Sequence, residues 1–186
     1  MKLSILIPYI KRHQHCFQSL AVELSRQAIP YSEEIEILFD NDENDKIGTK
    51  RNRLLERATG DYVAFFDADD DPSNEYIKLI MEGLETECDC TSLKGDYSVD
   101  GRFDGVFEHS IKYNAWRTTT NEIKYERYPN HLNPIKATIA KQFKFPETNH
   151  GEDADWSTQI HKAGLLKNEY YIDDIIYYYN YVTNKI

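Results

Sequence analysis

The sequence contains little cysteine, which limits what can hold the chain together. Only Cys16, Cys88 and Cys90 occur in 186 residues. This odd, low number argues against a disulfide framework and fits a reducing compartment, so we expect a cytoplasmic protein. The Cys88-Asp89-Cys90 segment has no second cysteine pair and is a weak zinc candidate. Two cysteines on one face of a strand are the better interpretation.

Long hydrophobic runs are also absent. No stretch approaches the roughly 18 apolar residues that a membrane helix needs. Residues 3–7 are apolar but are followed by Pro8, and they are too few for the core of a signal peptide. We therefore expect a soluble protein and no transmembrane segment, while a peripheral membrane contact stays open.

Basic residues are also few in comparison with acidic ones. The chain has 22 Lys and Arg against 32 Asp and Glu, for a net charge of −10. Nucleic-acid binding by general electrostatics needs clustered basic residues, so a nucleic-acid partner is not expected. Hydrophobic residues make up 40% of the chain. That content, over this length, predicts one folded domain with a real core.

What the sequence does have is a dense acidic segment. The apolar run 62–66, bounded by Gly60 and Pro72, is typical of a buried strand. Four acids follow it within five positions: Asp67, Asp69, Asp70 and Asp71. Parallel strands carry ligands at their carboxyl ends, and clustered carboxylates suit Mg²⁺ or Mn²⁺ bound together with phosphate oxygens. The alternative is an acidic loop that caps a helix.

Three consecutive strand–helix units predict the fold class. Such units form a right-handed, parallel α/β sheet. The expected strands are residues 3–7, 35–39 and 62–66, and helical spacing of apolar residues follows each of them. Pro8, Asp40 and Asp67, which end these strands, should line one edge of the sheet.

The second half of the chain is less regular. Asp100-Gly101 between extended segments suggests a hairpin, and a helix is expected to open at Gly151-Glu152-Asp153. Residues 170–182 read as a tyrosine-rich strand. Residues 112–133 are polar and aromatic and carry no pattern that assigns them.

Several short segments occur in an informative order. They are Ser4-Ile5-Leu6-Ile7-Pro8-Tyr9, Asp40-Asn41-Asp42-Glu43-Asn44-Asp45, Lys50-Arg51-Asn52, Gly60-Asp61-Tyr62, Phe66-Asp67-Ala68-Asp69-Asp70, Gly151-Glu152-Asp153 and Tyr177-Tyr178-Tyr179-Asn180. Together they resemble the family-2 glycosyltransferases of the GT-A fold, whose Asp-x-Asp signature the fifth segment matches. The chain departs from the family pattern at Asn41-Asp42, where Asp-Gly is usual, and at Asn180, where Arg is more common.

The resemblance implies a fold and a reaction. The fold would be a three-layer α/β/α GT-A sandwich with a central mixed, mainly parallel sheet. Residues 1–186 would form a single domain, with 1–94 as the nucleotide-sugar-binding half and 95–186 as the acceptor and catalytic-base half. The reaction would be metal-dependent, inverting transfer of a sugar from a nucleotide diphosphate, expected to be UDP, to an acceptor hydroxyl in glycan or glycoconjugate synthesis.

The resemblance also implies a donor site. Asp40 would accept a hydrogen bond from the ring N–H of the base, and Pro8 would offer backbone groups beside it. Arg51 would reach the base or a phosphate. Asp67 would contact the ribose or a metal-bound water. The bland alternative for Arg51 is a solvated helix residue.

Roles in metal binding and proton transfer follow from the same resemblance. Asp69 would bind Mn²⁺ or Mg²⁺, with Asp67 and Asp70 nearby. Asp153 would be the general base, with Glu152 and Asp155 as its rivals. The chemistry needs acids at two distant points in sequence, because the leaving diphosphate gains charge while the acceptor hydroxyl loses a proton.

Several residues near these motifs have two interpretations. Glu152, Asp153 and Asp155 could simply favour a helix N-terminus, where acids complement the dipole. His131 and His150 could contact acceptor or phosphate, although a lone histidine is more often structural. Trp116 and Trp156 could stack on sugars, and for Trp156 core packing is the better interpretation.

Two other functions stay open from the sequence. One is a GT-A nucleotidyltransferase, whose Gly-rich loop after the first strand is replaced here by Tyr9-Ile10-Lys11-Arg12-His13. The other is a non-catalytic sugar-nucleotide-binding domain, against which the retention of both acid motifs argues. The chain is short for its family, so we expect a small acceptor or one that another chain recognises.

Overall fold

The main sheet carries the predicted parallel core. The computed structural model describes residues 2–183. Strands β1 (Leu3–Pro8), β2 (Ile35–Asp40) and β3 (Tyr62–Phe65) pair in parallel, with β1 in the middle. The short strands that complete the sheet are β10 (Ile135–Lys136), β5 (Cys90–Thr91) and β11 (Glu169–Tyr170), in the order β11-β5-β10-β3-β1-β2. Because β10 runs antiparallel to its neighbours, the sheet is mixed and mainly parallel, as predicted.

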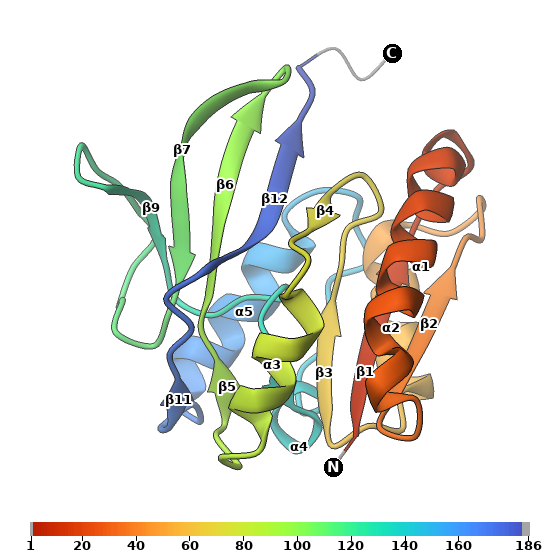
Figure 1. The fold of residues 1–186 in the computed structure, drawn as a ribbon, viewed down its shortest axis with the longest axis horizontal. Helices are drawn as coiled ribbons and strands as arrows, with labels where there is room; N and C mark the ends of the chain where they lie inside the picture. Colours follow the sequence, from red (N-terminus) through yellow and green to blue (C-terminus); the bar gives the residue numbers. More distant parts are fainter. Residues whose placement is uncertain (1, 184–186) are drawn as a thin grey trace.

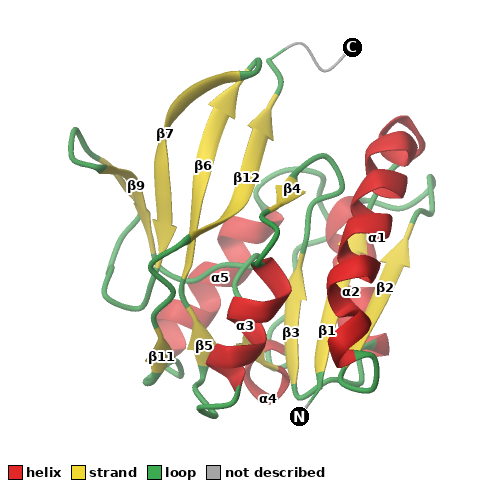
Figure 2. Cartoon of the chain, viewed as in Figure 1, coloured by secondary structure: helices red, strands yellow, loops and turns green. Residues whose placement is uncertain are grey.

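Helices cover both faces of the main sheet, which gives the three layers (Figures 1 and 2). One core cluster joins the strands to α1 (Gln14–Ala28) and α3 (Tyr76–Leu84). The cluster on the other face includes α2 (Ile47–Arg57), α4 (Ala137–Ala140) and α5 (Glu152–Ala163). Two 3₁₀ turns, η1 (Lys11–His13) and η2 (Ile29–Tyr31), flank α1.

The alternation of side chains along β1 explains why the core is divided into two clusters. Leu3, Ile5 and Ile7 pack in the cluster with α1, whereas Leu6 packs in the cluster with α2. Side chains of a strand alternate between the faces of a sheet, so a strand covered on both faces is apolar throughout. This is why the apolar run 3–7 correctly predicted a strand, and the structure places that strand between two others.

A second sheet, which the sequence did not predict, extends beyond the main sheet (Figure 1). Its order is β4-β12-β6-β7-β9-β8. The strands are β4 (Asp71–Pro72), β12 (Ile175–Tyr181), β6 (Leu93–Val99), β7 (Arg102–His109), β9 (Ile123–Arg127) and β8 (Arg117–Thr118). The expected hairpin joins β6 to β7 through Asp100 and Gly101, both at positive φ. The unassigned residues 112–133 hold β8 and β9.

The acidic segment bridges the two sheets. It lies between β3 of the main sheet and β4 of the second sheet, which pairs with β12. A helix does not open directly at Pro72; α3 begins at Tyr76. The acids therefore occupy the junction where the chain passes from one sheet to the other.

The two neighbouring cysteines do not share one face of a strand. Cys88 precedes β5 and belongs to the cluster with α1, while Cys90 lies in β5 and belongs to the cluster with α2. That interpretation was wrong because β5 begins only at Cys90. Among residues 2–183, no helix is both long enough and apolar enough to cross a membrane.

Candidate active site

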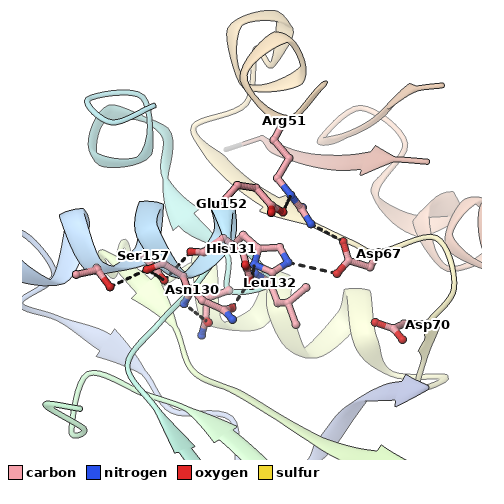
Figure 3. A network of polar contacts seen from close by, with 12 residues as sticks. Arg51, Asp67, Asp70, Asn130, His131, Leu132, Glu152 and Ser157 are labelled. Atoms are coloured by element: carbon pink, nitrogen blue, oxygen red, sulfur yellow. Dashed lines mark hydrogen bonds and ion pairs between the residues drawn. The ribbon is translucent and has the colours of Figure 1, made fainter. Parts of the chain in front are cut away.

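Asp67 is the centre of the site. It follows β3, and its carboxylate accepts a hydrogen bond from Arg51 Nη2 at 2.8 Å through Oδ1. Its Oδ2 lies 3.4 Å from His131 Nε2 (Figure 3). Burial alone would raise the pKa of Asp67, but the Arg51 guanidinium and His131 hold it well below its usual range. Asp67 is therefore a carboxylate at neutral pH.

Arg51 connects three elements at this point. It lies on α2 and is buried, with 4% of its side chain exposed, so the solvated interpretation was wrong. Its Nε donates to Glu152 Oε1 of α5 at 3.2 Å, and its guanidinium lies 5.2 Å from the ring centroid of Phe65 in β3. Its Nη1 is buried without a hydrogen-bond partner among the residues that the structure describes. An unsatisfied buried donor is costly, so this nitrogen is a candidate ligand contact.

A cleft of about 500 Å³, which we call the donor cleft, lies at the carboxyl ends of the parallel strands. It includes five residues that the sequence nominated, namely Pro8, Arg51, Asp67, Asp69 and Glu152. Its remaining lining residues are Tyr9, Ile10, Arg12, His13, Glu43, Asp45, Ile47, Ala68, Asn149 and His150. The basic residues after β1 and the acids after β3 thus face the same space.

Asp40 is not among the residues that line the donor cleft. Its carboxylate accepts hydrogen bonds from Arg53 Nε at 2.6 Å and from the Asp42 backbone N–H at 3.1 Å. Burial would raise its pKa, yet these contacts lower it. Asp40 pairs with Pro8 in the strand register, as the edge prediction required. Contact between Asp40 and a base stays a prediction, since its oxygens already have partners.

The acids nominated for a metal separate into two groups. Asp67 and Asp69 line the donor cleft, and Asp69 Oδ2 lies 3.6 Å from His13 Nδ1. Asp70 turns toward β12, where it accepts from Tyr177 Oη and from the Asn180 N–H, each at 2.8 Å. Burial, together with the neighbouring Asp67, raises the pKa of Asp70 well above its usual value. Figure 3 shows Asp70 apart from the network around Asp67.

The donor set fits a divalent cation that brings its own phosphate ligands. Within the described part of the chain, no group of three or more His, Cys, Asp or Glu is arranged to hold a metal. Mg²⁺ and Mn²⁺ sites of nucleotide enzymes need only one or two protein carboxylates, because phosphate and water supply the other oxygens. Asp69 and Asp67 meet that requirement, and Asp70 does so less well.

A second cavity, of about 260 Å³, also borders Asp67 and is lined mainly by aromatic rings. We call it the aromatic cavity. Asp67 lines both the donor cleft and the aromatic cavity. The other residues that line it are Tyr97, Phe107, His109, Trp116, Tyr125, Arg127, Asn130, His131, Leu132, Asp153 and Tyr179.

The first turn of α5 distributes its acids among different surroundings. Glu152 lines the donor cleft and is buried against Arg51. Asp153 lines the aromatic cavity with 32% of its side chain exposed, and its Oδ2 lies 3.7 Å from His131 Nδ1. Asp155 is exposed and accepts from Gln159 Nε2 at 2.7 Å. Of the three, only Asp153 reaches the aromatic cavity.

His131 stands between the two carboxylates. It is buried, and its ring nitrogens face Asp67 and Asp153 at 3.4 and 3.7 Å. The sequence offered no signal that distinguished it from a structural histidine. Of the tryptophans, Trp116 lines the aromatic cavity, whereas Trp156 is buried and stacks on Phe145 at 4.7 Å, which confirms the core-packing interpretation.

Sequence reasoning missed most of the aromatic cavity. Tyr97, Tyr125, Arg127 and Tyr179 come from β6, β9 and β12 of the unpredicted second sheet. The tyrosine-rich tail was expected to form a strand, and β12 (Ile175–Tyr181) confirms this. Its composition could not show which neighbouring strands it would join.

Comparisons with known proteins were informative at two levels. The family model described as Glycosyl transferase family 2 matches residues 21–147. S. aureus TarS superposes with a TM-score of 0.65 and 17% identity, over 97% of this chain and 37% of TarS. S. aureus TarS 1-349 in complex with UDP-GlcNAc superposes with a TM-score of 0.65 and 16% identity. The superposition covers 97% of this chain and 58% of the TarS 1-349 chain.

These solved structures share the fold and extend well beyond it. A complex of TarS 1-349 with UDP also gives a TM-score of 0.65 at 16% identity and is covered over 60% of its length. The present chain thus spans less than two thirds of each of these neighbours. At such identities the likeness establishes the fold alone. A comparison with curated protein sequences found no match.

Proposed function

Because the chain belongs to glycosyl transferase family 2, we propose that it transfers a sugar from a uridine diphosphate sugar to an acceptor hydroxyl, with inversion of the anomeric configuration. One observation carries this proposal: Asp67 lines both a donor cleft that holds Asp69 and an aromatic cavity that holds Asp153. Asp69 and Asp153 thus line two different spaces that share one carboxylate. The UDP and UDP-GlcNAc complexes of TarS support uridine as the base.

The donor cleft supplies the contacts that a nucleotide diphosphate needs. Pro8 and Tyr9 offer backbone groups at the end of β1, and Arg51 brings a buried guanidinium with an unpartnered Nη1. A guanidinium recognises phosphate oxygens strongly in a desolvated site. Arg51 is already fixed by Asp67 and Glu152, so it would lose little freedom when the donor binds.

Asp69, with Asp67, would hold Mg²⁺ or Mn²⁺ against the diphosphate. When bound, such a cation stabilises the negative charge that the departing diphosphate gains. The task of the chain is then to keep both carboxylates ionised and aimed into the cleft. Arg51 and His131 do this for Asp67 by holding its pKa low.

Asp153 is the best-placed general base. Glu152 is committed to Arg51, while the Asp153 carboxylate is partly exposed within the aromatic cavity. An acceptor hydroxyl in that cavity would pass its proton to Asp153 as its oxygen attacks the sugar. Attack from the aromatic cavity on a sugar whose diphosphate lies in the donor cleft is direct displacement, which inverts the anomeric centre.

Calorimetric titration tests the donor half of this proposal. We expect UDP with Mn²⁺ to bind more tightly than ADP with Mn²⁺. Asp69→Asn should weaken binding of UDP with Mn²⁺ by about tenfold or more, because charge-assisted contacts of this kind contribute about 1.5–3 kcal/mol. Asp71→Asn is the matched control, since Asp71 is exposed and bonds to Asn180 instead.

Three results of that titration would count against the proposal. Tighter binding of ADP than of UDP would contradict the uridine assignment. An equal effect of Asp69→Asn and Asp71→Asn would contradict the role of Asp69. No binding of any nucleotide diphosphate would contradict the proposed function as a whole.

A further inference from the structure

The aromatic cavity contains one arginine, Arg127, which is the last residue of β9. Its guanidinium carbon lies 5.2 Å from the ring centroid of Trp116 and 5.6 Å from that of Tyr125. Its Nη1 donates to the backbone oxygens of Arg117 and Glu126 at 2.5 and 2.9 Å. Two rings and two carbonyls thus fix the side chain in place.

The rest of this guanidinium has no partner in the part of the chain that the structure describes. Within residues 2–183, Nε and Nη2 of Arg127 make no hydrogen bond, and the side chain forms no ion pair. The other described arginines without an ion pair, Arg12, Arg57, Arg102 and Arg117, are exposed, whereas Arg127 is half-buried. Arg51 and Arg53, by contrast, each contact two carboxylates within hydrogen-bond distance. Desolvating a cation that has no counter-charge costs free energy, unless a bound ligand supplies the counter-charge and the missing hydrogen bonds.

The other groups of the cavity do not supply this charge. Burial lowers the pKa of His109 to about 3, so this histidine is neutral at pH 7. His131 is already placed between Asp67 and Asp153. Arg127 is therefore the fixed positive charge of a cavity whose walls are otherwise mainly aromatic.

We propose that the aromatic cavity binds the acceptor and that Arg127 selects acceptors carrying a carboxylate or phosphate group. Nε–H and Nη2–H form the guanidinium edge that donates two parallel hydrogen bonds to an oxyanion. Trp116 and the stacked pair Tyr97 and Tyr179 supply ring faces for a sugar or polyol. The inference rests on the proposed function, because it assigns the partner of Asp153.

The size of the cavity limits how much acceptor it encloses. About 260 Å³ is at the small end for ligand sites. It would hold one ring-sized unit with its anionic group, rather than several units of a chain. The selected substrate class is therefore a hydroxyl compound with an acidic substituent close to the reacting ring.

Binding of small probes tests this inference without any measurement of turnover. The probes are glucuronate, glucose 6-phosphate and neutral glucose, with UDP and Mg²⁺ added to fill the donor cleft. The readout is the indole N–H signal of Trp116 in ¹⁵N NMR, assigned with Trp116→Phe, while the buried Trp156 serves as internal reference. We expect at least one of the two anions to bind tenfold or more tightly than glucose.

Variants of Arg127 locate the source of that preference. Arg127→Gln should abolish the preference for anions over glucose. Arg127→Lys should keep only part of that preference, because lysine retains the positive charge but not the two parallel N–H donors of the guanidinium. Arg102→Gln removes an exposed arginine of β7 and should change nothing. Melting curves check each fold, and the lysine variant decides the matter if the glutamine variant does not fold.

The outcomes separate this inference from the proposed function. Equal binding of glucose and both anions, or a preference that survives in Arg127→Gln, overturns it. So does an equal loss in Arg127→Gln and Arg102→Gln, which would indicate a general charge effect. A preference for only one anion identifies the acidic group as carboxylate or phosphate. Nucleotide binding is measured separately, so its failure removes the proposed function rather than the role of Arg127.

Discussion

Acidic side chains at the two ends of the parallel strands have different surroundings. At the amino end, Glu36 of β2 accepts hydrogen bonds from Ser4 Oγ, from the Thr59 N–H and hydroxyl, and from Lys2 Nζ. At the carboxyl end, Asp67 and Asp69 face a cleft. The carboxylate of Glu36 is thus enclosed by hydrogen bonds from the chain, whereas Asp67 and Asp69 border open space.

The pKa values of Glu36 and Asp67 are both lowered, but by different kinds of partner. Burial would raise the pKa of Glu36, but its hydrogen bonds lower it to about 2. Asp67 is also held low, yet by Arg51 and His131, which both border a cavity. A lowered pKa therefore does not identify a functional acid by itself. What distinguishes the two ends is access to open space.

The largest effect is expected at the carboxyl end, for the proposed base. Asp153→Asn keeps the size of the side chain but cannot accept a proton at neutral pH, so kcat should fall by about a hundredfold or more. The Kd for UDP should stay near that of the wild type, because Asp153 lies outside the donor cleft. Steady-state transfer assays and calorimetry measure the two quantities.

Asp155→Asn is the matched control for that change. Asp155 lies in the same turn of α5 but is exposed and bonds to Gln159. Its replacement should leave kcat within about twofold of the wild type. Comparable losses in the two variants would contradict the assignment of Asp153.

The next largest effect is on stability, and two arginines of α2 provide the comparison. Arg51→Met leaves Asp67 and Glu152 without their partner in a buried setting, which should cost about 3–5 kcal/mol of unfolding free energy. Arg53→Met should cost about 1–2 kcal/mol, because 38% of the Arg53 side chain is exposed and water can replace it. Urea unfolding measures both, and equal costs would contradict the account of Arg51 as the buried connector.

The smallest effect is expected at the amino end. Glu36→Gln should lower the unfolding free energy by about 1–2 kcal/mol at pH 7 and leave the Kd for UDP unchanged. Because the folded-state pKa is depressed to about 2 from an ordinary 4.5, Glu36 contributes fully above pH 4.5, and its contribution is lost as the pH falls toward 2. Urea unfolding between pH 7 and pH 3 measures this; a difference between wild type and variant that grows on acidification would contradict it.

The parallel core could be predicted from the sequence because its signals are local. Continuous apolar runs, helical spacing and stops at proline or glycine fix β1, β2, β3 and the helices between them. Gly60 adds a requirement that is not local, since a Cβ there would lie 2.6 Å from Ser4 Oγ, 56 positions earlier in the chain. The other features do not depend on a distant partner.

The second sheet could not be predicted, because it depends on distant pairing. β12 pairs with β6 and β4, and β7 pairs in parallel with β9, which follows it only after the β8 excursion. These strands are partly exposed and mix polar with aromatic residues, so neither period dominates. The aromatic cavity therefore stayed hidden, although several of its residues are adjacent to recognised motifs.

Individual site residues could not be placed from the sequence for the same reason. Asp70 bonds to Tyr177 and Asn180, more than 100 residues away, and its role as a metal ligand stays a prediction. The sequence left open whether Arg51 is solvated, and its contacts with Phe65 and Glu152 bury it. The sequence indicated the candidate acids as a group, and tertiary contacts decide which of them face a cavity.

The most direct test of the account is the configuration of the first product. In the proposed mechanism, Asp153 deprotonates an acceptor in the aromatic cavity while the diphosphate leaves into the donor cleft, so the acceptor attacks the face of the sugar opposite the leaving group. Proton NMR during turnover of an α-linked UDP-sugar should therefore show a β-linked product as the first species formed. An α-linked first product would contradict the proposed placement of the acceptor in the aromatic cavity and of the donor in the donor cleft.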